Sequence, residues 1–310
     1  MKLAKLALLS LCLAAAGRMT PAEAALSVFA CEPEWGALAT ELGGSKVDVY
    51  VATTAKQDPH QIQARPSLIA RVRGADLVAC TGAELEVGWM PVVFRQSGNA
   101  KVQPGGPGYF AAADYVRLLE VPNRLDRADG DVHAAGNPHI QTSPKNIRLV
   151  AVALGKKLAT LDPPNAAFYA ERQKAFLQKW DEASAKRDAK AASLKGVNIV
   201  AQHRFWIYMM DWLGMKEGLT IEPKPGVPPG SAHIAELIES IPKQGAKMIL
   251  FTSYEDPRAA DTVGERTKIP AVMLPATVGG SAAAIDLIAL YDDIVNRLLA
   301  GLGGHAGARS

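Results

Sequence analysis

The sequence predicts an α/β fold of two lobes, each with a central, mostly parallel sheet flanked by helices, joined by one long rigid helix. In both halves of the chain, short apolar runs bounded by turn residues alternate with segments of helical periodicity, which is the pattern of parallel α/β sheets. Between the halves, residues 165–194 are rich in Ala, Lys, Arg and Glu and contain no Pro or Gly. This run predicts a single helix of about thirty residues, long enough at ~1.5 Å per residue to span a small domain.

Length and charge restrict the class of protein. The chain has 310 residues, of which 48% are hydrophobic and 21% charged, so it can bury two cores. A net charge of +3 is too small to indicate a nucleic-acid partner.

The first residues have the composition of a secretory signal peptide. Lys2 and Lys5 precede a short apolar run over 6–16, and Ala-Glu-Ala at 22–24 forms a small-residue cleavage site. The run is too short to anchor the chain in a bilayer. Cys12 follows Leu rather than Gly or Ala, which disfavours lipid attachment. We therefore expect cleavage to release a soluble protein into the periplasm.

The expected organisation follows from these patterns. It comprises a signal peptide over 1–25, an N-terminal α/β lobe over 26–162, an interlobe linker helix over 163–195, a C-terminal α/β lobe over 196–302 and a disordered tail over 303–310.

The N-terminal half begins with an apolar run that ends at CEPEW and predicts a buried strand. The helix that follows should stop at Gly43-Gly44, because glycine adopts the left-handed conformation that ends helices. Residues 101–108 are rich in Pro and Gly and predict an exposed loop. The expected strands are 26–31, 47–52 and 75–81, and the expected helices are 35–42, 66–73, 87–96 and 146–161.

The C-terminal half repeats the alternation. Its helix at 233–240 should be ended by Pro242, which cannot donate a backbone hydrogen bond. The expected strands are 197–202, 217–222, 247–252 and 271–274, and the expected helices are 205–213, 233–240 and 283–299.

Two cysteines remain after the signal peptide, Cys31 and Cys80, each at the end of a predicted strand. An even pair in an oxidising compartment is consistent with a disulfide. Two small buried residues that end core strands explain the same pattern. The sequence leaves both interpretations open.

Three histidines stand where a strand or strand-like run gives way to a turn or helix: His60 in QDPHQIQ, His139 in GNPHIQTSP and His203 in IVAQHRFW. The carboxyl ends of parallel strands form the ligand-binding edge of α/β sheets, so these imidazoles should converge between the lobes. The proline before His60 and before His139 restricts the backbone that enters each of them. Neutral imidazole is a preferred ligand of Zn²⁺. We assign no role to His233 or His305.

These motifs resemble the metal-specific solute-binding proteins of ABC importers, the zinc- and manganese-binding group. The likeness covers the whole mature chain. It includes DPHQIQARPS, NPHIQTSP, the strand-end His203 with FWIYMMDWLG shortly after it, and GAELEVGW, which contains Glu84 to Trp89. The resemblance implies two lobes joined by a rigid helix, with His60 and His139 of the first lobe and His203 of the second binding the metal. It also implies a membrane permease as partner.

The sequence departs from that family at the fourth ligand. Many members supply an aspartate after the last strand, where this chain reads LPATVGG. The candidates for the fourth position are a water molecule and four side chains: His133, Glu255, Asp256 and Glu34. A ligand set of imidazoles without that carboxylate favours Zn²⁺ over Mn²⁺.

The sequence thus predicts an exported, monomeric, non-enzymatic protein that captures Zn²⁺ and delivers it to an ABC-type permease. Whether a metallochaperone loads the metal is left open. The alternative is a secreted zinc hydrolase or hydratase, because three histidines and a bound water also form a catalytic zinc site. The sequence contains no HExxH motif to support that alternative.

Overall fold

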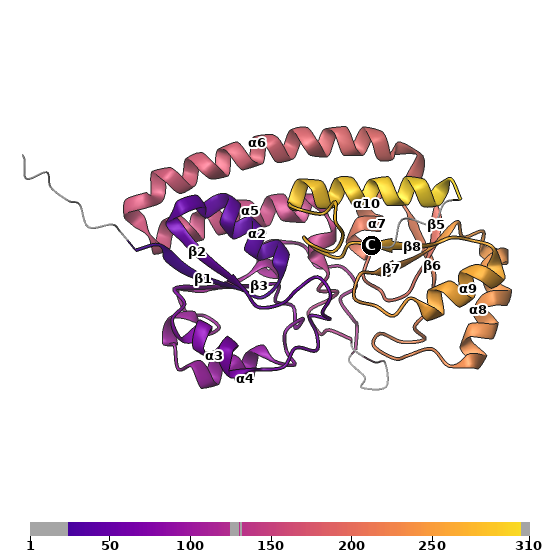
Figure 1. Ribbon diagram of the computed structural model, residues 1–310, viewed down its shortest axis with the longest axis horizontal. Coiled ribbons are helices and arrows are strands. Elements are labelled where there is room, and N and C mark those ends of the chain that lie inside the picture. Colours follow the sequence, from indigo (N-terminus) through magenta and orange to yellow (C-terminus); the bar gives the residue numbers. More distant parts are fainter. Residues whose placement is uncertain (1–23, 125–129, 131, 305–310) are drawn as a thin grey trace, which may run out of the picture.

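The computed structural model describes residues 24–124, 130 and 132–304, so the expected signal peptide and the end of the tail lie outside the described residues, apart from residues 24–25 and 303–304. Two four-stranded sheets lie side by side, each flanked by helices (Figure 1). The N-terminal lobe contains β1 (Leu26–Ala30), α2 (Pro33–Gly43), β2 (Val47–Val51), α3 (Pro66–Arg73), β3 (Leu77–Cys80), α4 (Met90–Ser97), β4 (Tyr109–Ala111) and α5 (Pro144–Leu161). After α6 (Ala166–Lys190), the C-terminal lobe contains β5 (Asn198–Ala201), α7 (Ile207–Leu213), β6 (Lys216–Thr220), α8 (Ser231–Gln244), β7 (Met248–Thr252), α9 (Arg258–Thr267), β8 (Ala271–Leu274) and α10 (Leu287–Leu302).

Both sheets are parallel and share one topology. The first has the strand order β2-β1-β3-β4, and the second has β6-β5-β7-β8. In each lobe the first strand in the sequence therefore pairs with the second and the third. This arrangement confirms the predicted fold class and places the carboxyl ends of the central strands of each lobe at the interlobe region.

One continuous apolar cluster runs through both lobes on the side covered by α5, α6, α7 and α10. Smaller clusters lie under α3 and α4 in the first lobe and under α8 and α9 in the second. The two lobes therefore share one core on the α6 side, whereas their apolar clusters on the opposite side are separate.

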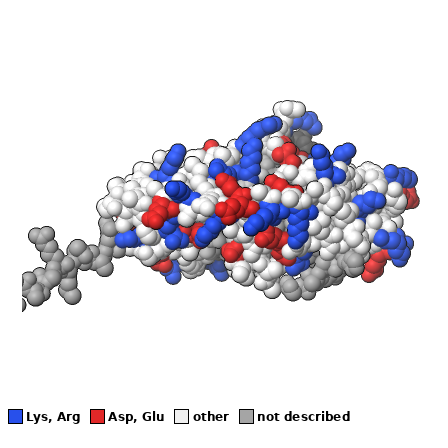
Figure 2. Space-filling view, turned by 90° about the horizontal axis from the view of Figure 1, so that it is seen from above, with Lys and Arg blue, Asp and Glu red and all other residues white. Residues whose placement is uncertain are grey.

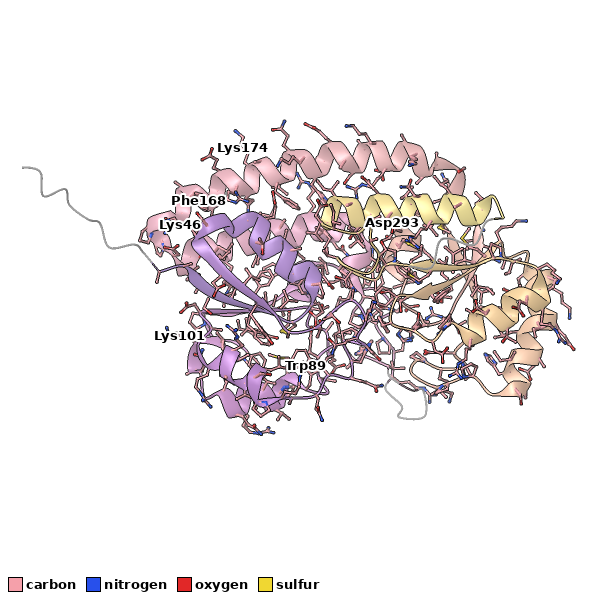
Figure 3. The ribbon with its side chains drawn as sticks, viewed as in Figure 1. Lys46, Trp89, Lys101, Phe168, Lys174 and Asp293 are labelled. Atoms are coloured by element: carbon pink, nitrogen blue, oxygen red, sulfur yellow. A yellow bond between two sulfur atoms is a disulfide. The ribbon has the colours of Figure 1, made fainter. Side chains whose placement is uncertain are left out.

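The long helix α6 extends over both lobes (Figure 1). Tyr169, Phe176 and Trp180 form its buried stripe, at the seven- and four-residue spacing of one helix face. The Trp180 indole N–H donates to the carbonyl of Pro144 at 3.0 Å. Phe168 lies near its start, beside the N-terminal lobe, whereas Lys174 points to solvent (Figure 3). Figure 2 looks onto this side of the molecule and shows acidic and basic side chains interspersed, as expected for a solvated helix face.

Several bounds differ from the expected ones by a few residues, and the predicted single helix over 165–194 is α6 flanked by 3₁₀ turns. Three larger differences have a clear physical cause. Strand β4 and helix α9 were not predicted, because YFA is only three residues long and the segment of α9 is mostly polar. Helix α8 does not end before Pro242 but continues to Gln244. The proline lies in the last turn, where it costs few helical bonds, and Gly245 with φ +66° ends the helix.

Cys31 and Cys80 form a disulfide, so the structure resolves the alternative that the sequence left open. Their strands are neighbours, with Ala30 beside Ala79 in the parallel register. Within the part of the chain that the structure describes, no helix has both the length and the apolar character needed to cross a bilayer.

Candidate metal centre

His60 is held by its own loop, in the segment that follows β2. Its backbone N–H donates to Asp58 Oδ1 at 3.0 Å, and its ring Nδ1 lies 2.7 Å from the same oxygen. The Trp89 indole N–H donates to the carbonyl of Pro59 at 3.0 Å, and Trp89 lies at the interlobe side of the first lobe (Figure 3). Because the carboxylate fixes the proton on Nδ1, the lone pair is on Nε2, which is buried and has no hydrogen-bond partner.

His139 is only 1% exposed and lies directly before a 3₁₀ turn that leads into α5. Its N–H donates to Asn137 Oδ1 at 3.0 Å, and its ring packs on Phe205 with 4.3 Å between ring centroids. Asn137 also joins the lobes, since its amide donates to the carbonyl of Arg204 and its carbonyl accepts from the Tyr208 hydroxyl. The second lobe therefore helps to position this histidine.

His203 follows β5 by two residues. Its Nδ1 lies 2.7 Å from Glu222 Oε2, beyond the end of the neighbouring strand β6. The same carboxylate oxygen accepts from the Gly226 N–H at 2.9 Å. His60 and His203 thus repeat one device, in which a carboxylate binds Nδ1 and leaves Nε2 for a ligand.

The three rings meet between the lobes. One ligand atom from each of His60, His139 and His203 lies within 4.8 Å of the others, and the two Nε2 atoms of His139 and His203 are 3.3 Å apart. Tetrahedral zinc with Zn–N bonds of ~2.0–2.1 Å requires ligand nitrogens roughly 3.3 Å from one another. The His139–His203 pair already has that spacing, and the third ring needs only a small movement.

The protonation states of these rings differ. Burial lowers the pKa of His139 well below its usual value, and the neighbouring histidines lower it further, so this ring is neutral. Burial alone would also lower the pKa of His203, but the hydrogen bond and charge of Glu222 outweigh it and raise that pKa. His203 therefore keeps its second proton to a higher pH than a free imidazole does, and a metal must displace that proton wherever it is bound.

A cavity of ≈ 690 Å³ opens beside His60 and His203. Glu255 lines it: its Oε2 accepts from the Thr252 N–H, while its buried Oε1 has no hydrogen-bond partner. Burial raises the pKa of Glu255 to about 7. This carboxyl lines the same cavity as His60 and His203 but is not part of the 4.8 Å group.

The other sequence candidates for a fourth ligand lie in different surroundings. The His133 ring is 5.3 Å from that of His60 between centroids. Asp256 is exposed and pairs with Arg258. Glu34 lies in a separate cavity and accepts from the Thr277 hydroxyl at 2.6 Å. None of the three belongs to the 4.8 Å group.

Sequence reasoning missed the two carboxylates that orient the imidazoles. Asp58 lies two residues before His60, and this Asp-x-His spacing could have indicated the contact. Glu222 is 19 residues from His203 along the chain and meets it only because β5 and β6 are adjacent. No local signal in the sequence shows that pairing.

Comparison with known proteins shows the family to which the chain belongs. Residues 28–301 match the family described as "Zinc-uptake complex component A periplasmic" (ZnuA). The chain belongs to this family. Its fold is similar to that of a crystal structure of ZnuA, with a TM-score of 0.71 at 19% identity over 88% of this chain and 99% of that one. It is also similar to the Mn-bound periplasmic metal-binding protein of Candidatus Liberibacter asiaticus, with a TM-score of 0.72 at 18% identity over 89% and 98% of the two chains.

Curated relatives cover most of the chain at low identity. The manganese ABC transporter substrate-binding lipoprotein PsaA of Streptococcus anginosus is 24% identical over 74% of this chain and 72% of its own length. The iron ABC transporter substrate-binding lipoprotein MtsA of Streptococcus pyogenes serotype M1 has the same identity and coverage. This ZnuA-family chain is therefore the metal-binding component of an ABC transporter and not an enzyme, so the hydrolase alternative is wrong.

Proposed function

We propose that this ZnuA-family protein captures Zn²⁺ with His60, His139 and His203 and delivers it to an ABC-type permease in the membrane. The observation that carries the proposal is the meeting of three imidazoles from two lobes, with ligand atoms within 4.8 Å of one another. Two of the rings already have Nδ1 bound to a carboxylate, so Nε2 faces the metal position.

The preference for zinc rests on ligand chemistry. The names of the relatives mention manganese and iron as well as zinc, so family membership does not decide the metal. Imidazole nitrogen suits Zn²⁺, whereas Mn²⁺ prefers carboxylate oxygen. Among the described residues, the cluster that joins the lobes is made of imidazoles alone.

The metal binds to deprotonated ring nitrogens, so it must replace any proton that an imidazole holds at that position. His139 offers a neutral ring, and His203 gives up its proton as the ion binds. The fourth position is open to a water molecule from the 690 Å³ cavity or to Glu255, whose unpartnered oxygen lines that cavity. Docking on the permease would release the ion through rearrangement of the loops that hold His60 and His139.

We infer that the chain acts in the periplasm, after removal of the signal peptide predicted over 1–25. It would act as a monomer, because the metal position is completed by the two lobes of one chain. Loading by a metallochaperone is compatible with the open side of the cavity but is not needed for the chemistry.

The decisive experiment is metal analysis of untagged protein, followed by competition of Zn²⁺ against Mn²⁺. We expect about one equivalent of zinc and a strong preference for zinc over manganese. A variant with His60, His139 and His203 changed to Ala should stay folded and lose tight zinc binding, while His233→Ala serves as the matched control. Equal zinc affinity in the triple variant would refute the ligand assignment.

A further inference from the structure

Arg204, the residue directly after His203, contacts carboxylates from both lobes. Toward the first lobe, its Nη2 donates to Glu120 Oε1, and its Nε donates to Glu120 Oε2 at 3.4 Å. Within the second lobe, its Nη1 lies 3.3 Å from Oε1 of Glu217 on β6. Each guanidinium nitrogen thus faces a carboxylate oxygen, which is the forked recognition that arginine provides. Nothing in the proposed zinc chemistry uses these side chains.

Glu217 holds the arginine from within its own lobe. Its side chain is only 7% exposed, whereas that of Arg204 is 44% exposed. A carboxyl buried on a strand is fixed by its packing, so the ion pair with Glu217 restricts the positions that the guanidinium can take. The arginine therefore loses less side-chain entropy when it pairs with Glu120 than a free surface arginine would.

Glu120 is held from the side of the first lobe. Its φ of +53° lies in the left-handed region, which residues other than glycine seldom adopt. Such a conformation persists where the surrounding contacts enforce it. One of these contacts is the Asn137 amide, which donates to Glu120 Oε2 at 3.1 Å. The carboxylate of Glu120 thus has a defined place between Asn137 and Arg204.

These contacts connect the segments that carry two of the three imidazoles. The Asn137 amide also donates to the Arg204 carbonyl at 2.8 Å, and Asn137 Oδ1 accepts from the His139 N–H at 3.0 Å. Arg204 is bonded directly to His203 in the chain. The 3.3 Å spacing between the Nε2 atoms of His139 and His203 therefore depends on how firmly Glu120 and Arg204 hold the two segments together.

A cavity of ≈ 220 Å³ borders the same group of residues. Glu120, Asn137 and Arg204 line it together with His139 and His203. The ion pair thus belongs to the immediate surroundings of the metal position and is not a remote surface contact. If it opened, the two segments could separate beside this cavity, and water could reach the two rings.

We propose that Glu120 and Arg204 form an interlobe clasp that raises the affinity for the metal ion by keeping His139 and His203 at the ligand spacing. This inference rests on the proposed function, in which those two rings bind the metal. Glu120 and Arg204 are positioning residues, because neither belongs to the 4.8 Å group of ligand atoms. A site that is already assembled loses less free energy to the ordering of its ligands when the ion binds.

The sign of the effect separates a clasp from the action of charge through space. A carboxylate near the site attracts a cation, and a guanidinium repels it. Through space alone, Glu120→Ala would therefore weaken Zn²⁺ binding, whereas Arg204→Ala would strengthen it. A clasp predicts that both substitutions weaken binding, because either one opens the same ion pair.

Competition of Zn²⁺ between the protein and a chelator tests the proposal in Glu120→Ala, Arg204→Ala and the double variant. We expect each single variant to bind Zn²⁺ about threefold to fivefold more weakly, equivalent to about 0.6–1 kcal/mol, as for a partly exposed ion pair. The double variant should lose no more than about fivefold, since each single substitution already opens the clasp. Arg204→Lys should recover part of the loss, because its ammonium group can still pair with Glu120.

Arg258→Ala is the matched control, because it removes an exposed guanidinium whose partner, Asp256, lies in the same lobe. It should change the zinc affinity less than twofold. Unchanged or tighter zinc binding in Arg204→Ala, or losses that multiply in the double variant, would overturn the clasp. Failure of the proposed function has a different signature, namely zinc binding that survives replacement of all three histidines by Ala.

Discussion

The two lobes have equivalent backbone positions at the interlobe region, but these positions carry different side chains. In the first lobe the Cys31 N–H, after β1, donates to the carbonyl of Ala79 on β3 at 2.8 Å. In the second lobe the Gln202 N–H, after β5, donates to the carbonyl of Leu250 on β7 at the same distance. The residues that follow are therefore structural counterparts, Glu32 in one lobe and His203 in the other.

This pair shows how one position can serve two chemistries. Glu32 turns a carboxyl into the buried cavity between the lobes, whereas His203 turns an imidazole toward the other two histidines. His203 receives Glu222 from the neighbouring strand end as its partner. The parallel sheet determines where the side chain lies, and the residue type determines its chemistry.

The third strand of each lobe shows a closer likeness. The Thr81 N–H, after β3, donates to Glu86 Oε1 at 2.7 Å, and the Thr252 N–H, at the end of β7, donates to Glu255 Oε2. Both carboxyls are buried, and burial raises both pKa values to about 7. Both lobes thus have a buried glutamate at the end of their third strand. They differ in the residue that follows the first strand, which is Glu32 in one lobe and His203 in the other.

The sharpest test of this distinction compares His203→Gln with Glu32→Gln. A four-ligand zinc site worth about 10–16 kcal/mol divides into about 3 kcal/mol per ligand, so His203→Gln should weaken zinc binding roughly 10²–10³-fold. Glu32→Gln should leave zinc affinity within a few-fold, because its carboxyl faces the other cavity. Competition titration with a chelator measures both. Equal losses in the two variants would show that the cavities are one site.

The disulfide is a second difference between the lobes, since the sequence has no cysteine after Cys80. The bond closes a loop with a sequence separation of 49 residues, so Cys31→Ala/Cys80→Ala should cost about 2–4 kcal/mol of unfolding free energy. Urea unfolding of the variant and of the reduced wild type should agree. A loss below about 0.5 kcal/mol would mean that the first lobe does not rely on this link.

The Glu34 carboxyl and the His139 imidazole should make the stability of the protein respond to pH with opposite sign. The raised pKa of Glu34, about 7, means that the folded chain keeps a proton which the unfolded chain releases above about 4.5. Its contribution is complete below pH 4.5 and is lost as the pH rises through 7. For the metal-free protein we expect a loss of roughly 3 kcal/mol over that range from Glu34.

His139 has the opposite effect, because its lowered pKa makes stability fall as the pH drops below about 6.5. Unfolding in urea from pH 4.5 to 8, with Glu34→Gln compared with wild type, isolates the carboxyl contribution. The Gln variant should lack the decline between pH 4.5 and 7. An unchanged pH profile would show that Glu34 is ionised in the folded protein.

The smallest expected effect concerns the carboxylates that hold the imidazoles. Asp58→Asn and Glu222→Gln should each weaken zinc binding about 10–100-fold, because they orient a ring without binding the metal. Glu222→Gln should also shift the fall in zinc affinity to lower pH, since Glu222 raises the pKa of His203. If Glu222→Gln changed neither property, the 2.7 Å contact would have no part in metal binding.

The sequence predicted the architecture well because its periodicity is local. The fold class and the bounds of helix 66–73 and strand 271–274 agree with α3 and β8. The three histidines were identified from their turn chemistry, and the structure brings them together. The pairing of Cys31 with Cys80 was one of two open interpretations.

What the sequence did not show depends on contacts between distant segments. Glu222 reaches His203 only through the pairing of β5 with β6, and Glu34 reaches Thr277 across 243 residues. Glu34 was considered as a metal ligand, yet the structure places it in a different cavity. Burial and side-chain geometry of this kind arise from packing and have no periodic signature.

The continuous core beneath α6 bears on how fast the cargo can leave. A hinge between the lobes would have to bend this 25-residue helix and disturb the apolar cluster that crosses the boundary. The segment that holds His60 lies outside that cluster, whereas the segment of His139 is tied to it through Ile140. We therefore expect the residence time of the ion to be governed by microsecond-to-millisecond opening of the His60 segment rather than by rotation of whole lobes.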